Sequence, residues 1–456
     1  MQVATAVLLW STIATIATTH FDSITYLSNP NATTSTTRIN FGSCHKTKYD
    51  HSQVWTHIQA NRPSVFWWTG DSIYTNRSLR RSLGDLQALA SAYDNMTNDV
   101  YYSNFTAKSN NIVVEGVWDD HDYGVNDGGK HVSQKKERQA LFLQFLNTSN
   151  AQQMPPHKAR RQRNGAYSRH RYVQMGTQEK TQEKTQEKTQ EKTEQKGVVD
   201  VIFLDTRSHR DNHWWPSLGG TAVPMGAVLA TFTRLFSHVI GVRHEGDVLG
   251  EEQWQWLEDS LRASSSTTAN ITVVVSSIQI FTLNPMVESW LHFPVARQRL
   301  VRLIQHHVPP SAHVYFVSGD VHYGEFIYGN EHLPPLEITS SGLTHSCLNP
   351  FWGSLCPYIH YLFGSYHTSP YRNFGELNVA WEENRLSFRL RNASNGKVLQ
   401  AFNASIDGRE SGGEGVGNRF QVWQEDQRGA TMADWLVRVL WTCLLLVLVQ
   451  RRWGNL

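Results

Sequence analysis

Continuous apolar runs recur along the chain, and each ends in glycine or in polar residues. The runs that are typical of buried strands lie at 64–70, 111–120, 198–206, 271–281, 313–320 and 336–342. Helix-like segments stand between several of them, at 250–264 and 295–307. Strands that alternate with helices predict an α/β domain. Because the apolar runs are continuous, we expect sheets that are covered on both faces.

A polar repeat interrupts this pattern at residues 177–196, which consist of near-identical TQEK tetrapeptides. Every position is polar, so the repeat cannot supply a core, although its Glu and Lys spacing allows a charged helix. Its neighbours, 165–176 and 197–210, are both strand-like, which predicts a loop insert in a β-hairpin. A closing antiparallel run is expected over 376–406.

The two ends of the chain are apolar. Residues 1–20 resemble a secretory signal peptide, although a basic start is missing, and a buried first strand or an uncleaved anchor is the alternative. After a Gly- and Glu-rich linker at 406–431, residues 432–450 resemble a transmembrane segment. A lipid-anchor signal and an amphipathic surface helix are the alternatives there. The sequence thus predicts a single-pass type I protein with its main globular domain at 21–405.

Composition and cysteine usage fit a secretory location, at the cell surface or in an endomembrane. With 456 residues, 18% charged residues and a net charge of +2, the chain gives no reason to expect a nucleic-acid-binding surface. Cys347 and Cys356 are close enough to form a disulfide in an oxidising compartment, whereas Cys44 has no obvious partner. Sequons that predict N-linked glycans occur at Asn31, Asn76, Asn95, Asn104, Asn147, Asn270, Asn392 and Asn403.

Residues with affinity for metals follow several of the predicted strands. They are Cys44; Asp71 and Tyr74; Asp119, Asp120, His121 and Asp122; and Asp320 and His322. Sites in α/β domains form where strands deliver their carboxyl ends, so these side chains can meet. So much negative charge is costly without a cation, and a bound metal pair removes that cost and lowers the pKa of a bound water. Cys and Tyr ligate as anions, which favours ferric iron.

Short motifs in order along the chain carry a resemblance to a known family. They are Ser43–Cys44, Gly70–Asp71 with Tyr74, Trp118–His121, Leu204–Arg207 and Gly319–His322. Together they resemble the PhoD-type alkaline phosphatases/phosphodiesterases, within the calcineurin-like metallophosphoesterase superfamily. The resemblance covers residues from about 38 to 400. It implies a four-layer α/β/β/α sandwich with mixed sheets.

The resemblance also implies a dinuclear metal centre. The ligands of a ferric ion would be Cys44, Asp71, Tyr74 and His322. A second ion, calcium or another divalent cation, would be held by Asp120 and Asp320, with Asp71 as the bridge. Ser277 and Gln279 stand where the wider superfamily places another histidine ligand, and neither is a strong ligand. That part of the second site stays open.

The catalytic residues implied by the resemblance are His121 and Arg207. His121 would assist the leaving oxygen. Arg207 would either face the phosphate or support the site from behind. Asp119 and Asp122 fit a structural role better than ligation, and His45, His209 and His345 fit surface or satisfied histidines.

The implied function is hydrolysis of a phosphate ester outside the cytosol by a metal-bound hydroxide that attacks phosphorus in line. Whether the substrate is a monoester or a diester stays open. A catalytically inactive, glycosylated surface receptor or binding protein on the same fold is the alternative. The TQEK repeat could serve as an interaction module that is unrelated to turnover.

Overall fold

The computed structural model describes residues 21–27, 35–75, 85–150, 158–176, 195–215, 226–240, 244–265, 271–308, 313–329, 335–348 and 355–407. Its strands form an eight-stranded sheet in the order β1-β5-β6-β7-β8-β10-β9-β11 and a six-stranded sheet in the order β14-β13-β12-β2-β3-β4. Both sheets mix parallel and antiparallel pairs. The described part of the chain is therefore a mixed α/β fold.

The strands of the larger sheet are β1 (Ser23–Leu27), β5 (Ser168–Met175), β6 (Gln195–Leu204), β7 (Ile271–Ser276), β8 (His313–Ser318), β9 (Gly324–Ile327), β10 (Glu337–Ser340) and β11 (Thr368–Ser369). Those of the smaller sheet are β2 (Thr36–Gly42), β3 (Val65–Thr69), β4 (Val113–Val117), β12 (Asn373–Ala380), β13 (Arg385–Asn392) and β14 (Val398–Ser405). Every residue of β3, β4 and β7 is buried, as their continuous apolar runs predict.

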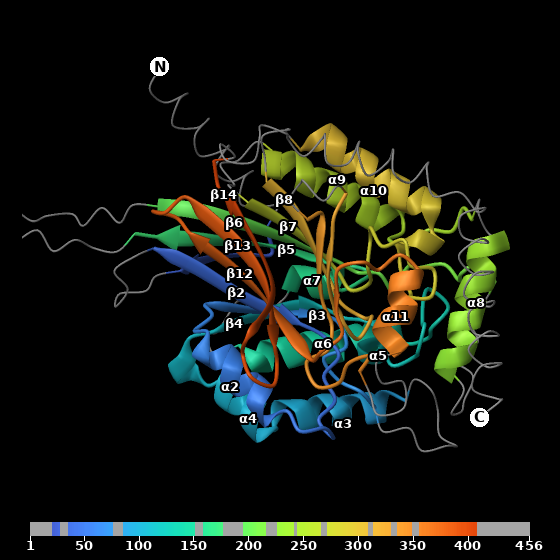
Figure 1. Ribbon diagram of the computed structural model, residues 1–456, viewed down its shortest axis with the longest axis horizontal. Helices are drawn as coiled ribbons and strands as arrows, with labels where there is room; N and C mark the ends of the chain where they lie inside the picture. The colour runs from blue at the N-terminus through green and yellow to red at the C-terminus, as the bar shows by residue number, and fades with distance from the viewer. Residues whose placement is uncertain are drawn as a thin grey trace, which may run out of the picture.

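Helices cover the outer faces of the two sheets (Figure 1). Over the larger sheet lie α9 (Glu251–Ser265) and α10 (Pro294–His307). On the side of the smaller sheet lie α2 (Ser52–Ala60), α3 (Leu86–Thr97), α4 (Val100–Phe105) and α6 (Lys135–Ser149). Shorter or more peripheral elements are η1 (Lys108–Asn110), α5 (Asp120–Tyr123), α7 (Lys158–Gln162), α8 (Gly226–Ile240), η2 (Trp290–His292) and α11 (Leu355–Leu362).

Two apolar cores hold these layers together. Between the sheets, Trp67 of β3 meets Phe203 of β6 with ring centroids 6.0 Å apart. Under α9 and α10, buried Leu257 and Leu300 share a second cluster with Phe316 of β8. Burying a side chain of this size contributes roughly 1.5–3 kcal/mol. The layers thus follow helix, sheet, sheet, helix, which is the order that the family resemblance implies.

The predicted hairpin around the TQEK repeat is confirmed. β5 and β6 pair antiparallel from Ser168 opposite Phe203 to Gln174 opposite Gly197. The repeat itself, up to residue 194, lies outside the described residues. The closing run is also confirmed, because β12, β13 and β14 pair antiparallel in sequence order.

The predicted signal peptide, at 1–20, lies outside the described residues, and β1 starts just after it, at Ser23. The predicted transmembrane segment, at 432–450, and nearly all of the linker also lie outside them. Across the described part of the chain, no helix combines the length and the apolar character that a membrane crossing requires. The signal, linker and anchor therefore stay predictions.

Candidate metal centre

The carboxyl ends of four strands converge on one place. β2, β3 and β4 are neighbouring parallel strands and so end at the same edge of the smaller sheet. β8 of the larger sheet ends against them at Gly319. A Cβ at this position would lie 2.5 Å from the Thr69 carbonyl oxygen and 2.6 Å from Ser43 Oγ. Glycine therefore allows the end of β8 to approach β2 and β3 this closely.

The backbone is strained where the predicted ligands stand. Cys44, Asp71, Asp320 and His322 have φ angles of 62°, 49°, 70° and 61°, in the left-handed region. For a residue with a Cβ this conformation costs roughly 1–2 kcal/mol. Such strain is kept when the fold needs a side chain aimed in one direction, and it gathers at functional sites. The strain therefore marks these strand ends as a site.

The four residues predicted to hold ferric iron lie together. Ligand atoms of Cys44, Asp71 and His322 lie within 4.8 Å of one another. Cys44 Sγ is 3.7 Å from Asp71 Oδ2, and the Tyr74 hydroxyl donates to the same oxygen at 2.5 Å. One carboxylate oxygen thus meets both the thiol and the phenol.

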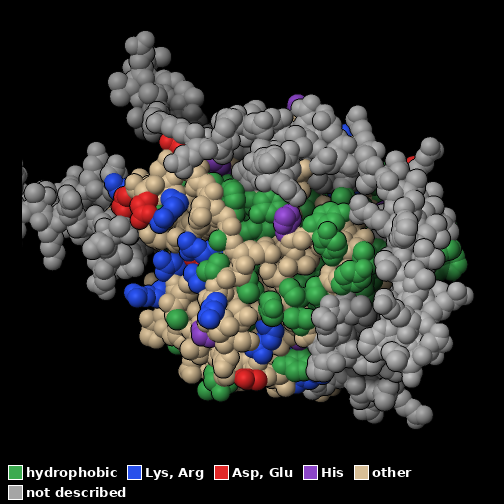
Figure 2. Space-filling model, in the orientation of Figure 1, with side chains coloured by type: hydrophobic (Ala, Val, Ile, Leu, Met, Phe, Trp, Pro, Cys, Tyr) green, Lys and Arg blue, Asp and Glu red, His purple; other side chains and the backbone are tan. Residues whose placement is uncertain are grey.

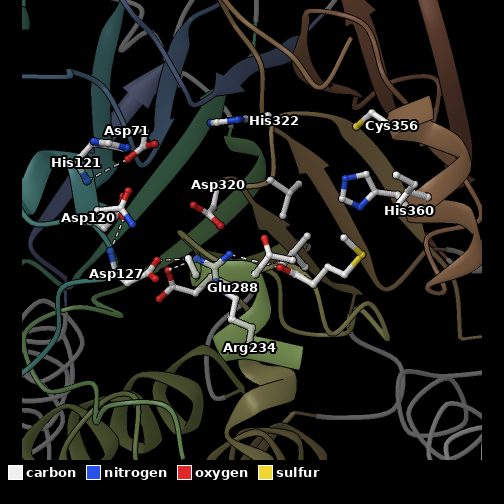
Figure 3. A pocket seen from close by; sticks show the side chains of 17 residues that line it. Asp71, Asp120, His121, Asp127, Arg234, Glu288, Asp320, His322, Cys356 and His360 are labelled. Atoms are coloured by element: carbon white, nitrogen blue, oxygen red, sulfur yellow. Dashed lines mark hydrogen bonds and ion pairs between the residues drawn. The ribbon is translucent and has the colours of Figure 1, made fainter. Parts of the chain in front are cut away.

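A second group surrounds the other side of Asp71. Carboxylate oxygens of Asp71, Asp119, Asp120 and Asp320 also lie within 4.8 Å of one another, and Asp71, Asp120 and Asp320 line a cavity of about 340 Å³ (Figure 3). Asp119 Oδ2 and Asp120 Oδ1 are buried without a hydrogen-bond partner among the described residues. Buried carboxylate oxygens rarely lack a hydrogen-bond partner. Asp71 belongs to both groups, which is the position of a bridging ligand.

His121 is fixed beside Asp71. Its backbone N–H donates to Asp71 Oδ1 at 3.3 Å, at the start of α5. Its ring lies against the Tyr74 ring, with centroids 3.9 Å apart, and it lines the cavity. Asp122 turns away from the centre and accepts from the backbone N–H groups of Ser72 and Asp119, each at 3.0 Å. The structural role expected for Asp122 fits this geometry.

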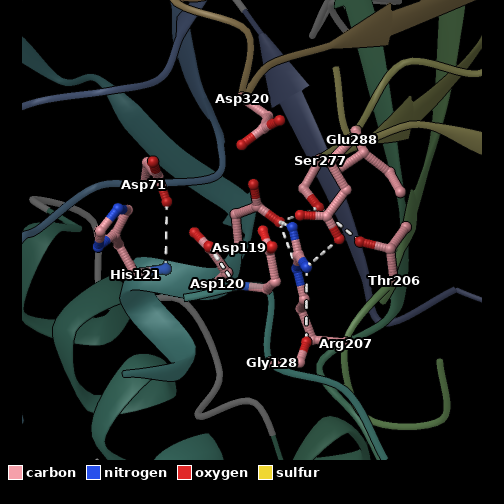
Figure 4. A network of polar contacts seen from close by, with 12 residues as sticks. Asp71, Asp119, Asp120, His121, Gly128, Thr206, Arg207, Ser277, Glu288 and Asp320 are labelled. Atoms are coloured by element: carbon pink, nitrogen blue, oxygen red, sulfur yellow. Dashed lines mark hydrogen bonds and ion pairs between the residues drawn. The ribbon is translucent and has the colours of Figure 1, made fainter. Parts of the chain in front are cut away.

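Arg207 lies behind the centre and does not line the cavity (Figure 4). Its guanidinium is fully buried, with Nε donating to Asp119 Oδ1 and Nη1 to Glu288 Oε1, both at 2.6 Å. Ser277 also donates to Asp119 Oδ1, at 2.7 Å. Of the two roles expected for Arg207, the geometry supports the one behind the ligands. We therefore treat Arg207 as a positioning residue rather than a catalytic one.

The sequence from residue 39 to 335 matches the PhoD-like phosphatase family. This chain belongs to that family. No curated protein sequence matches it. Among solved structures it is similar to PhoD, with 15% sequence identity and a TM-score of 0.52 over 84% of this chain and 72% of PhoD. At this identity the likeness to PhoD shows a shared fold.

Two further solved structures are similar at lower TM-scores. One is GAP50, the anchor in the inner membrane complex of Plasmodium, with 13% identity and a TM-score of 0.41 over 86% of this chain and 94% of GAP50. The other is the purple acid phosphatase PPD1 from yellow lupin (Lupinus luteus) seeds, with 11% identity and a TM-score of 0.42 over 82% of this chain and 54% of that enzyme.

Electrostatics show whether a cation suits this PhoD-like phosphatase. Burial, followed by repulsion from neighbouring carboxylates, raises the pKa values of Asp71 and Asp320 well above the ordinary range. Burial and the charge of Asp71 likewise raise the pKa values of the Cys44 thiol and the Tyr74 phenol. Their anionic forms need a nearby positive charge. The carboxylates, phenol, thiol and imidazole gathered here are donor types that bind metal ions, so the residues fit a metal-dependent phosphatase.

The cavity also holds residues that the sequence analysis missed. Glu288 and Asp127 line it and pair with Arg234 of α8, with 2.6 Å between Arg234 Nη2 and Asp127 Oδ1. Outside the cavity lining, the His345 ring lies 4.5 Å from that of His322. Glu288 follows β7 by a dozen residues of loop, and Arg234 stands in a helix with no motif. The sequence offered one indication of Glu288: it follows β7, and β7 ends at the same sheet edge as the other strands of the site.

Proposed function

We propose that this PhoD-like phosphatase is a dinuclear phosphate ester hydrolase with one ferric ion and one calcium or other divalent ion. The observation that carries the proposal is the shared position of Asp71 between two groups of candidate ligands. Family membership supports the coarser statement of a metal-dependent phosphoesterase. The proposed class is that of alkaline phosphatases and phosphodiesterases, with the choice between monoester and diester left to experiment.

The residues divide between the two ions as follows. Cys44, Asp71, Tyr74 and His322 would hold the ferric ion, and Asp71, Asp120 and Asp320 the second ion. The buried thiol, the phenol and the oxygens without partners supply the donors that such ions need. When bound, the ions neutralise charge on the phosphoryl oxygens and lower the pKa of a bound water.

The chain itself orients the reacting groups. His121 presents its ring to the cavity and is held by Asp71 and Tyr74, so it is placed to give a proton to the leaving oxygen. Arg207 and Ser277 fix Asp119 from behind, which keeps its neighbour Asp120 in place at the start of α5. Arg234 adds a positive charge at the cavity wall, between Asp127 and Glu288.

The proposed location is the secretory pathway, at the cell surface or in an endomembrane, with the catalytic domain on the lumenal or extracellular side. The Cys347–Cys356 disulfide supports an oxidising compartment. Sequon residues Asn95, Asn104 and Asn403 are exposed, so they are accessible to N-linked glycosylation. The predicted signal peptide and C-terminal anchor agree with this location. A mass loss on glycosidase treatment of the protein from eukaryotic cells is the expected result.

The test of the function uses the full chain on p-nitrophenyl phosphate and bis-p-nitrophenyl phosphate. Asp71→Asn keeps the size of the side chain but removes the bridging charge, and it should lower kcat/KM by about 10³-fold or more. Asp94→Asn, at an exposed position of α3, is the matched control and should leave the rate unchanged. Turnover that survives in Asp71→Asn would sink the proposal.

A further inference from the structure

Helix α8 has its polar residues inside and its aromatic residues outside. Thr233 and Ser237 are buried, whereas Phe232 is 66% exposed and Phe236 is 46% exposed. Ala230, Thr231 and Arg234 of the same helix line the cavity beside the metal centre. A surface helix of a globular protein usually shows the opposite arrangement. The outer face of α8 is therefore built to meet an apolar partner.

Tryptophan residues extend this outer face. Trp214 and Trp215 are 44% and 49% exposed, and the Trp215 ring packs on Phe236 with centroids 5.7 Å apart. Every exposed tryptophan and phenylalanine in the described ranges lies in this one group. Single exposed apolar residues are ordinary, but a contiguous group of large aromatic side chains marks an interaction surface.

A second exposed aromatic group stands on α11. Tyr358 and Tyr361 are exposed there, while Ile359 and His360 of the same helix line the cavity. Figure 2 shows hydrophobic side chains gathered over α11. The aromatic rim is defined here as Trp214, Trp215, Phe232, Phe236, Tyr358 and Tyr361. The rim thus stands on α8 and α11, which both line the cavity, and on Trp214 and Trp215, which pack against Phe236 of α8.

The cavity has a polar end and an apolar end. Candidate ligands such as Asp120 and Asp320 form the polar end. Ile359 of α11 and Val321, which packs in one cluster with Cys356 of α11, contribute an apolar lining on the α11 side. In Figure 3 the carboxylates near His121 lie on one side, and Cys356 and His360 of α11 on the other. A molecule with a phosphate at one end and hydrocarbon at the other matches this division.

We propose that the aromatic rim docks on a lipid bilayer and that the substrate is a membrane phospholipid. The proposal rests on the proposed function, because the phosphate would lie at the metal centre and the hydrocarbon at the apolar end. In the reaction, water adds its oxygen to phosphorus, one P–O ester bond breaks, and the alcohol leaves with a proton. Trp and Tyr favour the membrane–water interface, and helices with outward Phe lie in it.

Features of the chain itself favour a bilayer over a second copy of the chain. A second copy seated on both α8 and α11 would cover the cavity that these helices line, whereas a bilayer delivers a substrate to it. The sequence also carries the apolar segment 432–450, which is predicted to hold the chain at a membrane.

The test compares the wild-type full chain with Phe232→Gln/Phe236→Gln and with the control Val295→Gln. Val295 is a 50% exposed apolar residue of α10, a helix over the larger sheet, and it is not in the rim. All three proteins keep residues 432–450, so differences report the rim alone. One readout is hydrolysis of phosphatidylcholine in mixed phosphatidylcholine/phosphatidylserine vesicles, relative to soluble bis-p-nitrophenyl phosphate. The other is quenching of tryptophan fluorescence by brominated phosphatidylcholine in the same vesicles.

The rim variant should lose about tenfold or more of the vesicle rate and the part of the quenching that comes from Trp214 and Trp215, with the soluble rate unchanged. Trp435 and Trp441 of the shared segment 432–450 should be quenched alike in all three proteins. The control should match the wild type in both readouts. Equal vesicle rates and equal quenching in all three proteins would overturn the docking proposal, as would a wild-type dimer that the rim variant converts to monomers. A wild type that hydrolyses neither substrate would refute the proposed function instead, and the quenching comparison would then decide the docking claim alone.

Discussion

Asp71 and Glu376 are two buried carboxylates with opposite surroundings. Both are 1% exposed. Glu376 of β12 accepts from Arg391, from Arg389 at 2.8 Å and from Asn61 at 2.8 Å. Burial acts to raise its pKa, but these partners outweigh burial, and the net pKa is lowered.

Asp71 faces other acids instead. Burial and then the charge of Asp120 raise its pKa, and its φ of 49° adds backbone strain. The comparison shows that the fold can neutralise a buried carboxylate when it supplies arginine, as it does for Glu376. At the strand ends it gathers carboxylates and leaves their charge for a bound cation.

The largest expected difference is in activity. Asp71→Asn should lower kcat/KM by about 10³-fold, because the bridging charge is lost. Glu376→Gln should leave kcat/KM within about twofold, since the Glu376 carboxylate pairs with Asn61, Arg389 and Arg391 and with none of the candidate ligands. Steady-state assays on bis-p-nitrophenyl phosphate measure both. Similar losses in the two variants would remove the distinction between the regions.

Stability should reverse this order. Glu376→Gln leaves Arg389 and Arg391 short of a buried partner and should cost about 3 kcal/mol of unfolding free energy. In chelator-treated protein, Asp71→Asn removes a buried acid whose charged form is disfavoured by burial and by Asp120, and it should be neutral or stabilising. Urea unfolding followed by circular dichroism measures both effects. A metal-free Asp71→Asn that is less stable than the wild type would show that the carboxylate is satisfied internally.

A third buried carboxylate, Glu325, should make the unfolding free energy depend on pH. Glu325 of β9 accepts from the Gln279 amide at 2.8 Å, and burial raises its pKa to about 8. A raised carboxyl pKa gives stability that is fully present below the unfolded pKa and is lost as pH rises toward 8. Between about pH 5 and 8, Glu325 should make the unfolding free energy of the wild type fall by roughly 1 kcal/mol per pH unit. Glu325→Gln should remove this contribution to the slope. An unchanged slope between about pH 5 and 8 would contradict the assignment.

The smallest effect is expected far from both regions. Deleting residues 177–194 leaves β5 and β6 to be joined by a short turn, and their register already places Gln174 opposite Gly197. The deletion should change kcat/KM less than twofold and the unfolding free energy by about 0.5 kcal/mol or less. A larger loss of activity would give the repeat a role in turnover.

Much of the fold could be predicted because the pattern of apolar runs is local. The buried strands, α9, α10, the interrupted hairpin and the closing antiparallel run each follow from their own residues. The pairing of strands from two sheets could not be read in this way. It depends on packing between distant segments, such as Trp67 against Phe203.

The candidate ligands were predictable for the same reason, since each one follows a strand that the sequence reveals. Glu288 and Arg234 were not, because a loop and a peripheral helix bring them to the cavity. Arg207 stands in a recognisable motif, yet its burial between Asp119 and Glu288 depends on those same loops. Motifs thus located the centre, and tertiary packing determined which charges support it.

Elemental analysis of the purified full chain, beside Asp71→Asn, tests the dinuclear centre most directly. The account predicts about one iron and one calcium or other divalent ion per wild-type chain, with both lost or strongly reduced in Asp71→Asn. A wild-type chain without bound metal, or an Asp71→Asn chain that keeps both ions, would contradict it.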